Sequence, residues 1–192
     1  MTYEDVYNEI DNGTLAIVFP DWKNYKKNID IADKKYPRLS FTFETQEIEN
    51  LSNLINCDGL VDYSKMESTT EKLLYSILWK QGDLQKIKHV IDGIHRSSSL
   101  ESKKEQRVFY QFGHHLSDRN EPIIDVNVFK AYATYTNDRK ALIKSGISKG
   151  PNGLNLTNDY IKWFKRITKG KNFHFELDRI MFAIGQQIKL PK

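Results

Sequence analysis

Cysteine is almost absent from this chain. Only Cys57 occurs among its 192 residues, so we expect neither an internal disulfide nor a metal or iron–sulfur site built from several cysteines. Long hydrophobic runs are also missing, since no apolar stretch approaches the ~20 residues that cross a bilayer. The N-terminal "MTYEDVYNEI" is acidic, where a secretory signal is basic. These absences predict no membrane contact, no cofactor and a cytoplasmic location.

Acidic and basic residues are unevenly distributed along the chain. The formal net charge is +4 overall, but residues 1–70 carry a net charge of −6 and residues 71–192 a net charge of +10. This asymmetry favours an anionic partner for the C-terminal part, and nucleic acid is the commonest such partner. A solvated, lysine-rich surface is the alternative interpretation. The oligomeric state leaves no signal in the sequence.

The N-terminal third has mixed secondary-structure signals. Thr2 and the acidic residues after it predict a short helix at about 3–11, and "TLAIVF" (14–19) and "LSFTF" (39–43) have the composition of strands. "ETQEIENLSNLI" (44–55) again predicts a helix. We therefore expect residues 1–68 to form an acidic mixed segment that packs on a basic helical domain at 69–192.

Helical signals dominate from residue 69 onward. Apolar stripes predict helices that include 73–78, 84–94, 160–167 and 177–188, with Gly82 and Asp83 at a tight helix–helix turn. A further helix is expected at about 101–116, with Val108, Phe109 and Phe112 facing the core. Another is expected to begin at Asp125, and another to lie within "NDRKALIKSG" (137–146). The segment "SKGPNGLNLTND" (148–159) predicts a loop. The predicted fold class is mainly α, an orthogonal helical domain with a mixed N-terminal segment.

Asp125 is the leading candidate for chemistry. It precedes an amphipathic helix, where a carboxylate accepts backbone N–H groups at the positive end of the helix dipole. Helix capping alone is a sufficient reason for an aspartate there. The preceding Pro122, Ile123 and Ile124 add an apolar anchor that a cap does not require. The same pattern therefore also suits a carboxylate fixed at the floor of a pocket.

"PIIDVNV" (122–128) resembles the active-site segment of the helix-hairpin-helix DNA glycosylase superfamily, in which an aspartate stands at a helix N-terminus. "LDRIMFAIGQQI" (177–188) is similar to a late helix of that superfamily. The resemblance covers about residues 70–190. It implies the orthogonal helical fold of that superfamily, double-stranded DNA as partner and base excision as activity. Asp125 would then stabilise the positive charge that develops on the sugar.

The segment expected to form the hairpin departs from the superfamily pattern. Instead of Leu-Pro-Gly-Val-Gly, the chain has "DGIHRSSSLESKKEQRVFYQFG", in which His95, Arg96, Ser97 and Ser98 are candidates for phosphate contact. Within the superfamily, a lysine in the following helix cleaves the strand through a Schiff base, whereas a serine there implies base removal only. The corresponding position falls at Ser102, Lys103 or Lys104. An exposed charged face is the alternative for the two lysines.

Basic and polar residues elsewhere complete the expected DNA interface. "NDYIKWFKRITKGKNFHF" (158–175) interleaves lysines with aromatics, so one helix could bury its rings and face phosphates. Tyr110, Phe112, Tyr132 and Trp163 are candidates for the walls of a pocket for an extruded base, with the protein core as the alternative. The further candidates for nucleic-acid contact are Arg107, Asn127, Lys130, Lys162, Lys165 and Arg166.

Two other functions compete with base excision. The first is a catalytically silent helical module that binds nucleic acid or a protein, for example within a bacterial defence cassette. The second is a nuclease or toxin that uses His114 and His115. Because neighbouring residues on a helix point about 100° apart, these histidines are poorly arranged to bind one ion together, and no metal site is expected.

Overall fold

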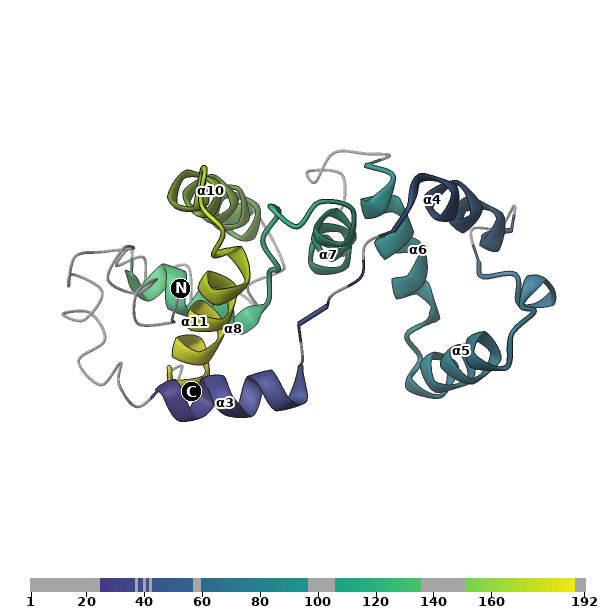
Figure 1. Ribbon diagram of the computed structural model, residues 1–192, viewed down its shortest axis with the longest axis horizontal. Coiled ribbons are helices and arrows are strands. Elements are labelled where there is room, and N and C mark those ends of the chain that lie inside the picture. Colours follow the sequence, from purple (N-terminus) through teal and green to yellow (C-terminus); the bar gives the residue numbers. More distant parts are fainter. Residues whose placement is uncertain are drawn as a thin grey trace. The chain divides into compact units, whose positions relative to one another are not determined.

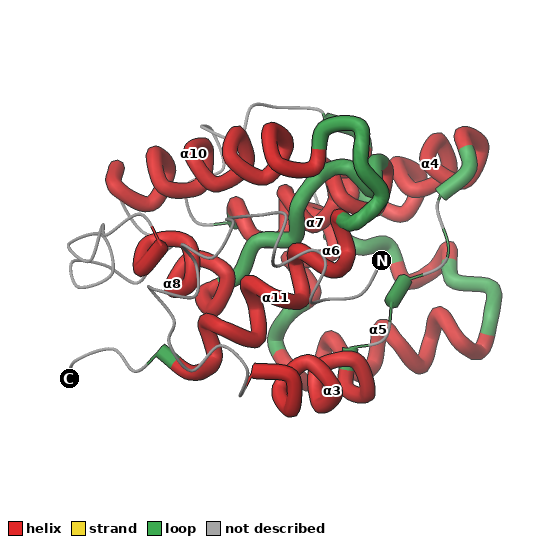
Figure 2. Tube along the Cα trace, turned by 60° about the vertical axis from the view of Figure 1, so that its left-hand side comes forward, coloured by secondary structure: helices red, strands yellow, loops and turns green. Residues whose placement is uncertain are grey.

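The computed structural model describes residues 25–36, 38–39, 41, 43–56, 60–96, 106–135 and 151–188. Within these ranges the chain forms eight α-helices and two short 3-10 helices, and no strand occurs (Figure 2). The predicted mainly α fold is therefore confirmed. Leu39, Phe41 and Phe43 of "LSFTF" form no strand, so that prediction was wrong for these residues. The elements predicted at 3–11, 14–19 and 137–146, as well as Cys57, lie outside the described residues.

The chain divides into two compact units whose boundaries differ from the one predicted at residue 68. Unit 1 comprises residues 1–40 and 119–192, and unit 2 comprises residues 41–118. Unit 1 joins both ends of the chain because α3 (Tyr25–Lys35) packs against α11 (His174–Gln187). The acidic first third is consequently divided between the units.

Unit 1 is built around α11. This helix packs against α8 (Val126–Tyr135) and α3, and α8 also contacts α10 (Pro151–Thr168) (Figure 1). Arg179 of α11 ties α3 in place, since its guanidinium donates to the Tyr36 carbonyl and lies 3.4 Å from the Asp33 carboxylate. The largest side chains of the unit 1 core are fully buried: Ile29, Ile124, Phe129, Tyr160, Phe164, Phe173, Leu177 and Ile180.

Helix α10 begins earlier than predicted. It starts at Pro151, so most of the segment expected to be a loop is helical. Proline suits the first position of a helix because its φ is already helical and its missing N–H would have no partner there. Leu156 and Tyr160 follow at helical spacing and are buried. Their burial outweighs the weak helix propensity of the glycine and asparagines that favoured a loop.

Unit 2 contains α4 (Thr45–Leu51), α5 (Thr69–Gln81), α6 (Leu84–Ile94) and α7 (Arg107–Ser117), with the 3-10 helices η2 (Ser52–Leu54) and η3 (Tyr63–Lys65). Helices α6 and α7 form its main contact, and they cross at two glycines. A Cβ atom on Gly93 would lie 2.0 Å from the Tyr110 carbonyl oxygen, and one on Gly113 would lie 2.1 Å from the Val90 carbonyl oxygen. The two backbones approach this closely because neither glycine has a side chain.

The ends of α5 follow the sequence signals closely. Ser68 and Glu71 form a reciprocal capping box at its N-terminus, and Gly82 ends it with φ +72°. The apolar stripe of α5 is nevertheless exposed at Leu73, Leu74 and Ile77. Within the described residues, every helix is too short or too polar to span a bilayer.

The buried face of α7 differs from the predicted one. Tyr110, Gly113 and Leu116 are buried on this helix, while Val108, Phe109 and Phe112 are only half-buried. The glycine crossing explains the difference, because Gly113 must face α6 and the residues at helical spacing from it turn inward with it.

Candidate functional site

Asp125 lies at the N-terminus of α8, as its sequence context predicts. Its Oδ1 accepts the backbone N–H of Val128 at 2.7 Å, and its carbonyl accepts that of Phe129 at 3.1 Å. Ile124 is 1% exposed, so the residue before the carboxylate is anchored in the core. The carboxylate itself is half-buried. Asp125 is therefore a helix cap, and one that is fixed from behind by apolar packing.

A second carboxylate, Asp178, supports the same turn from α11. It is buried, and it accepts the backbone N–H of Ile123 at 3.3 Å and the hydroxyl of Tyr160 at 3.4 Å. Asp178 also interacts electrostatically with Asp125. The chain just before Asp125 is thus tied to α11 and, through Tyr160, to α10. We call Asp125, Asp178 and Tyr160 the acid cluster.

Burial controls protonation in the acid cluster. It raises the pKa of Asp178 well above its ordinary value, against the opposing hydrogen bonds from Ile123 and Tyr160. Burial also raises the pKa of Asp125, opposed by hydrogen bonds from Val128 and Asn127 and by the charge of Lys130. The pKa of Tyr160 is raised well above its ordinary value by burial and by the charge of Asp178. Burial therefore favours the protonated form of both carboxyl groups.

An aromatic cluster connects the acid cluster to a surface pocket. The ring of Tyr160 lies 5.3 Å from that of Tyr132 and 5.8 Å from that of Trp163, and the last two are 5.5 Å apart. Tyr132 and Trp163 line a pocket of about 280 Å³ together with Asp159, Lys162 and Arg166. Asp125 does not line this pocket. The predicted walls Tyr132 and Trp163 thus border a pocket, whereas Tyr110 is completely buried in unit 2.

Comparisons with known proteins return no match. No protein-family model, no curated protein and no solved structure is similar to this chain.

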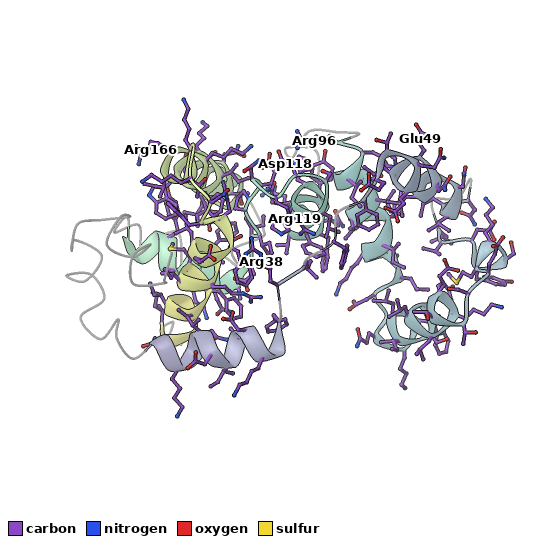
Figure 3. The ribbon with its side chains drawn as sticks, viewed as in Figure 1. Arg38, Glu49, Arg96, Asp118, Arg119 and Arg166 are labelled. Atoms are coloured by element: carbon purple, nitrogen blue, oxygen red, sulfur yellow. The ribbon has the colours of Figure 1, made fainter. Side chains whose placement is uncertain are left out.

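The predicted nucleic-acid contacts in unit 1 fall into three environments. Lys162 and Arg166 are exposed on α10 at the pocket, and Arg166 is marked in Figure 3. Lys165, on the same helix, forms an ion pair of 2.6 Å with the buried Glu121. Asn127 and Lys130 act on Asp125, through hydrogen bonds and through charge respectively. Of these five, only Lys162 and Arg166 have the surroundings expected of a ligand contact.

The predicted contacts in unit 2 lie around the ends of α6 and α7. His95 follows the last turn of α6, and Arg96 has φ +50° and pairs with Asp118 at 3.4 Å (Figure 3). Arg107 begins α7 and is buried, and this burial lowers the pKa of its guanidinium. Ser97, Ser98, Ser102, Lys103 and Lys104 lie outside the described residues.

The adjacent histidines of α7 pack separately. The ring of His114 lies 4.7 Å from that of Tyr110, while the ring of His115 stacks on Phe112 at 6.4 Å. In the part of the chain that the structure describes, no group of three histidine, cysteine or acidic side chains is arranged to hold a metal ion.

Sequence reasoning missed two groups of residues. Asp178 is an acidic residue on the apolar face of α11, beside Leu177 and Met181. A charged residue on a face of a helix that is otherwise apolar was the sequence signal that could have identified it. Arg38 and Arg119 lie close enough in unit 1 for the charge of Arg38 to lower the pKa of Arg119, after the larger effect of burial (Figure 3). No local pattern connects these two arginines, because they are far apart in the sequence.

Proposed function

We propose that this protein binds double-stranded DNA and removes damaged or modified bases by a reaction like that of DNA glycosylases, with Asp125 as the catalytic carboxylate. One observation carries the proposal: Asp125 is half-buried at a helix N-terminus, and its turn is anchored by Ile124 and by the Asp178 carboxylate. A carboxylate that only caps a surface helix needs neither anchor.

The proposed reaction is hydrolysis of an N-glycosidic bond. As the bond between C1′ and the base breaks, its electron pair leaves with the base, which takes up a proton from the solvent, and positive charge develops on the sugar. The ionised Asp125 stabilises this charge. Water then adds to C1′ and passes its proton to Asp125, which returns it to the solvent, so the products are the free base and an abasic sugar.

Asp178 acts as a positioning residue in this proposal. Asp178 interacts electrostatically with Asp125, and burial raises the pKa of both carboxyl groups. Asp178 also accepts the Ile123 N–H, two residues before Asp125. It therefore supports the position of Asp125.

The roles of Ser102, Lys103 and Lys104 remain predictions. A lysine amine at the corresponding position would attack C1′ and form a Schiff base, which leads to strand cleavage. A serine there would leave base removal as the complete reaction.

The test uses a panel of lesion-containing duplexes followed by alkali. Asparagine caps helices about as well as aspartate, so Asp125→Asn removes the charge and keeps the cap. Alkali-dependent breaks made by the parent and by the control Asp30→Asn, but not by Asp125→Asn, would support base excision. Asp30 is an exposed acid of α3 in the same unit. Borohydride trapping that is lost in Lys103→Ala or Lys104→Ala would identify the lyase amine.

The second candidate function is a silent helical module that binds nucleic acid. It is favoured by α10, whose exposed cations Lys162 and Arg166 line a pocket that Asp125 does not line. Intact strands across the whole lesion panel, with salt-sensitive binding retained, would contradict excision and favour this module. Breaks that require added metal and persist in Asp125→Asn would also contradict excision and indicate a nuclease.

A further inference from the structure

The pocket on α10 combines charged groups of both signs with an aromatic floor. Asp159, Lys162, Trp163 and Arg166 have the spacing i, i+3, i+4 and i+7 and so share one face of the helix. Tyr132 joins them from α8. The pocket therefore lies within unit 1 and takes its lining from two helices that contact each other.

The three charged groups of the pocket are available for a ligand. Asp159, Lys162 and Arg166 are exposed, and none of them forms a hydrogen bond or ion pair with another described residue. Lys165, on the same helix, differs because Glu121 holds its ammonium at 2.6 Å. Charged side chains that surround a pocket without engaging one another are suited to a ligand that carries its own charges.

The floor of the pocket is rigid. Trp163 and Tyr132 line the pocket but are only 6% and 7% exposed, so most of the surface of each side chain packs into the core. Both rings contact Tyr160, which is completely buried. Such a floor favours a flat ring over a flexible chain, because aromatic groups pair through edge and face contacts.

The size of the pocket limits the ligand. Its volume of about 280 Å³ is just below the range of ~300–1,000 Å³ that holds drug-sized molecules. One planar ring with a short charged arm fits this limit, whereas a stack of several bases does not.

We propose that this pocket binds one nucleotide with an unpaired base, whose ring lies against Tyr132 and Trp163 and whose phosphate lies between Lys162 and Arg166. An arginine fork and a lysine ammonium are the usual partners of phosphate oxygens. Asp159 accepts a hydrogen bond from the exocyclic amino group of the base. Such a group is accessible on a free nucleotide or in a single strand, whereas pairing occupies it in a duplex.

This inference goes beyond base excision and does not depend on it, because the pocket does not include Asp125. A nucleotide bound here would be held without reaction. Loss of nucleotide binding and loss of excision are therefore separable: substitutions at the pocket affect the first, and Asp125→Asn affects the second.

The test measures binding of dAMP, dCMP, dTMP and inorganic phosphate to the full chain by calorimetry, and of a labelled single-stranded oligonucleotide by anisotropy. We expect Lys162→Gln and Arg166→Gln each to weaken nucleotide binding about tenfold and to reduce the salt dependence by about one ion. The matched control is Lys169→Gln, since Lys169 is an exposed lysine just after α10 that does not line the pocket. It should bind as the parent does.

The Asp159→Asn variant tests recognition of the base. Loss of the carboxylate should reduce the preference for dAMP and dCMP over dTMP, which has no exocyclic amino group, while phosphate contact persists. Binding of dAMP alone at full strength identifies a free nucleotide as the source, and binding only of the oligonucleotide identifies a strand. Equal losses in Lys169→Gln and Arg166→Gln, inorganic phosphate binding as tightly as dAMP, or no binding of either the mononucleotides or the oligonucleotide would each overturn the proposal.

Discussion

Gly185 of α11 lies directly against the backbone of Asn127 in α8. A Cβ atom built on Gly185 would lie 1.8 Å from the Asn127 carbonyl oxygen and 2.4 Å from its carbonyl carbon. The two backbones can come this close only because Gly185 has no side chain. Since Asn127 is two residues after Asp125, this contact links the packing of α11 to the geometry of the acid cluster.

Gly185→Ala is therefore expected to destabilise unit 1. The added methyl group meets backbone atoms that cannot move independently, so α8 and α11 must separate, at a cost of about 1–3 kcal/mol or more. Thermal unfolding followed by circular dichroism measures the loss. Gly82→Ala is the comparison: nothing lies within 4 Å of its Cβ position, and only its φ of +72° opposes alanine, at a cost of roughly 1–2 kcal/mol. Equal losses in the two variants would contradict the close approach.

The acid cluster predicts a pH dependence of stability. The pKa of Asp178 is raised on folding, so its contribution to stability is fully present below the unfolded-state pKa and is lost as the pH rises through the folded-state pKa. Asp125 acts in the same direction. The asparagine in Asp178→Asn cannot ionise, so this variant does not share the parent's loss of stability as the pH rises. Its free energy of unfolding relative to that of the parent should therefore increase from about pH 4 to pH 7.

Urea denaturation across this pH range measures the effect. Asp30→Asn, at an exposed position of α3, serves as the control and should follow the parent at every pH. A difference between Asp178→Asn and the parent that stays constant with pH would indicate that Asp178 is equally ionised in the folded and unfolded states.

Lys165 and Lys162 of α10 are expected to contribute differently to the free energy of unfolding. Lys165→Gln breaks the 2.6 Å contact with buried Glu121 and should lower the free energy of unfolding by about 1 kcal/mol, a modest value because the lysine is half exposed. Lys162→Gln should change it by less than about 0.5 kcal/mol. Urea unfolding of both variants at one pH checks the contrast, which fails if the two losses are equal.

The exposed stripe of α5 predicts tolerance to polar substitution. Leu74 is 54% exposed, so Leu74→Lys should change stability by no more than about 0.5 kcal/mol. Phe164→Ala, at a completely buried position of α10, should cost about 3–5 kcal/mol. Thermal melts distinguish the two. A large loss in Leu74→Lys would mean that another surface covers this face of α5.

Local signals in the sequence predicted local structure well. The aspartate before an apolar stripe predicted the start of α8, and Gly82 was predicted at the end of α5, where the structure places it. The start of α10 was missed because the burial of Leu156 and Tyr160, a tertiary effect, outweighs a composition typical of loops.

Long-range contacts were the part that the sequence could not supply. Asp178 joins the Asp125 turn through a hydrogen bond to Ile123, a residue 55 positions away. The placement of α3 in unit 1 likewise follows from its packing on α11, where Arg179 contacts Asp33 and Tyr36. Tyr132 and Trp163 were predicted as pocket walls and Lys162 and Arg166 as nucleic-acid contacts, but the sequence did not show that all four line one pocket, because Tyr132 comes from another helix.

The two-part composition of unit 1 has a consequence for synthesis of the chain. Tyr36 and Arg179 are 143 positions apart, and at about 5–20 residues per second a ribosome needs roughly 7–30 seconds to translate from one to the other. During that time Ile29 and Ala32 of α3 have no α11 to cover them, whereas unit 2 ends at residue 118 and is translated completely before α11. The nascent protein therefore completes its middle before its beginning, and a chaperone that shields α3 would have its greatest effect in this interval.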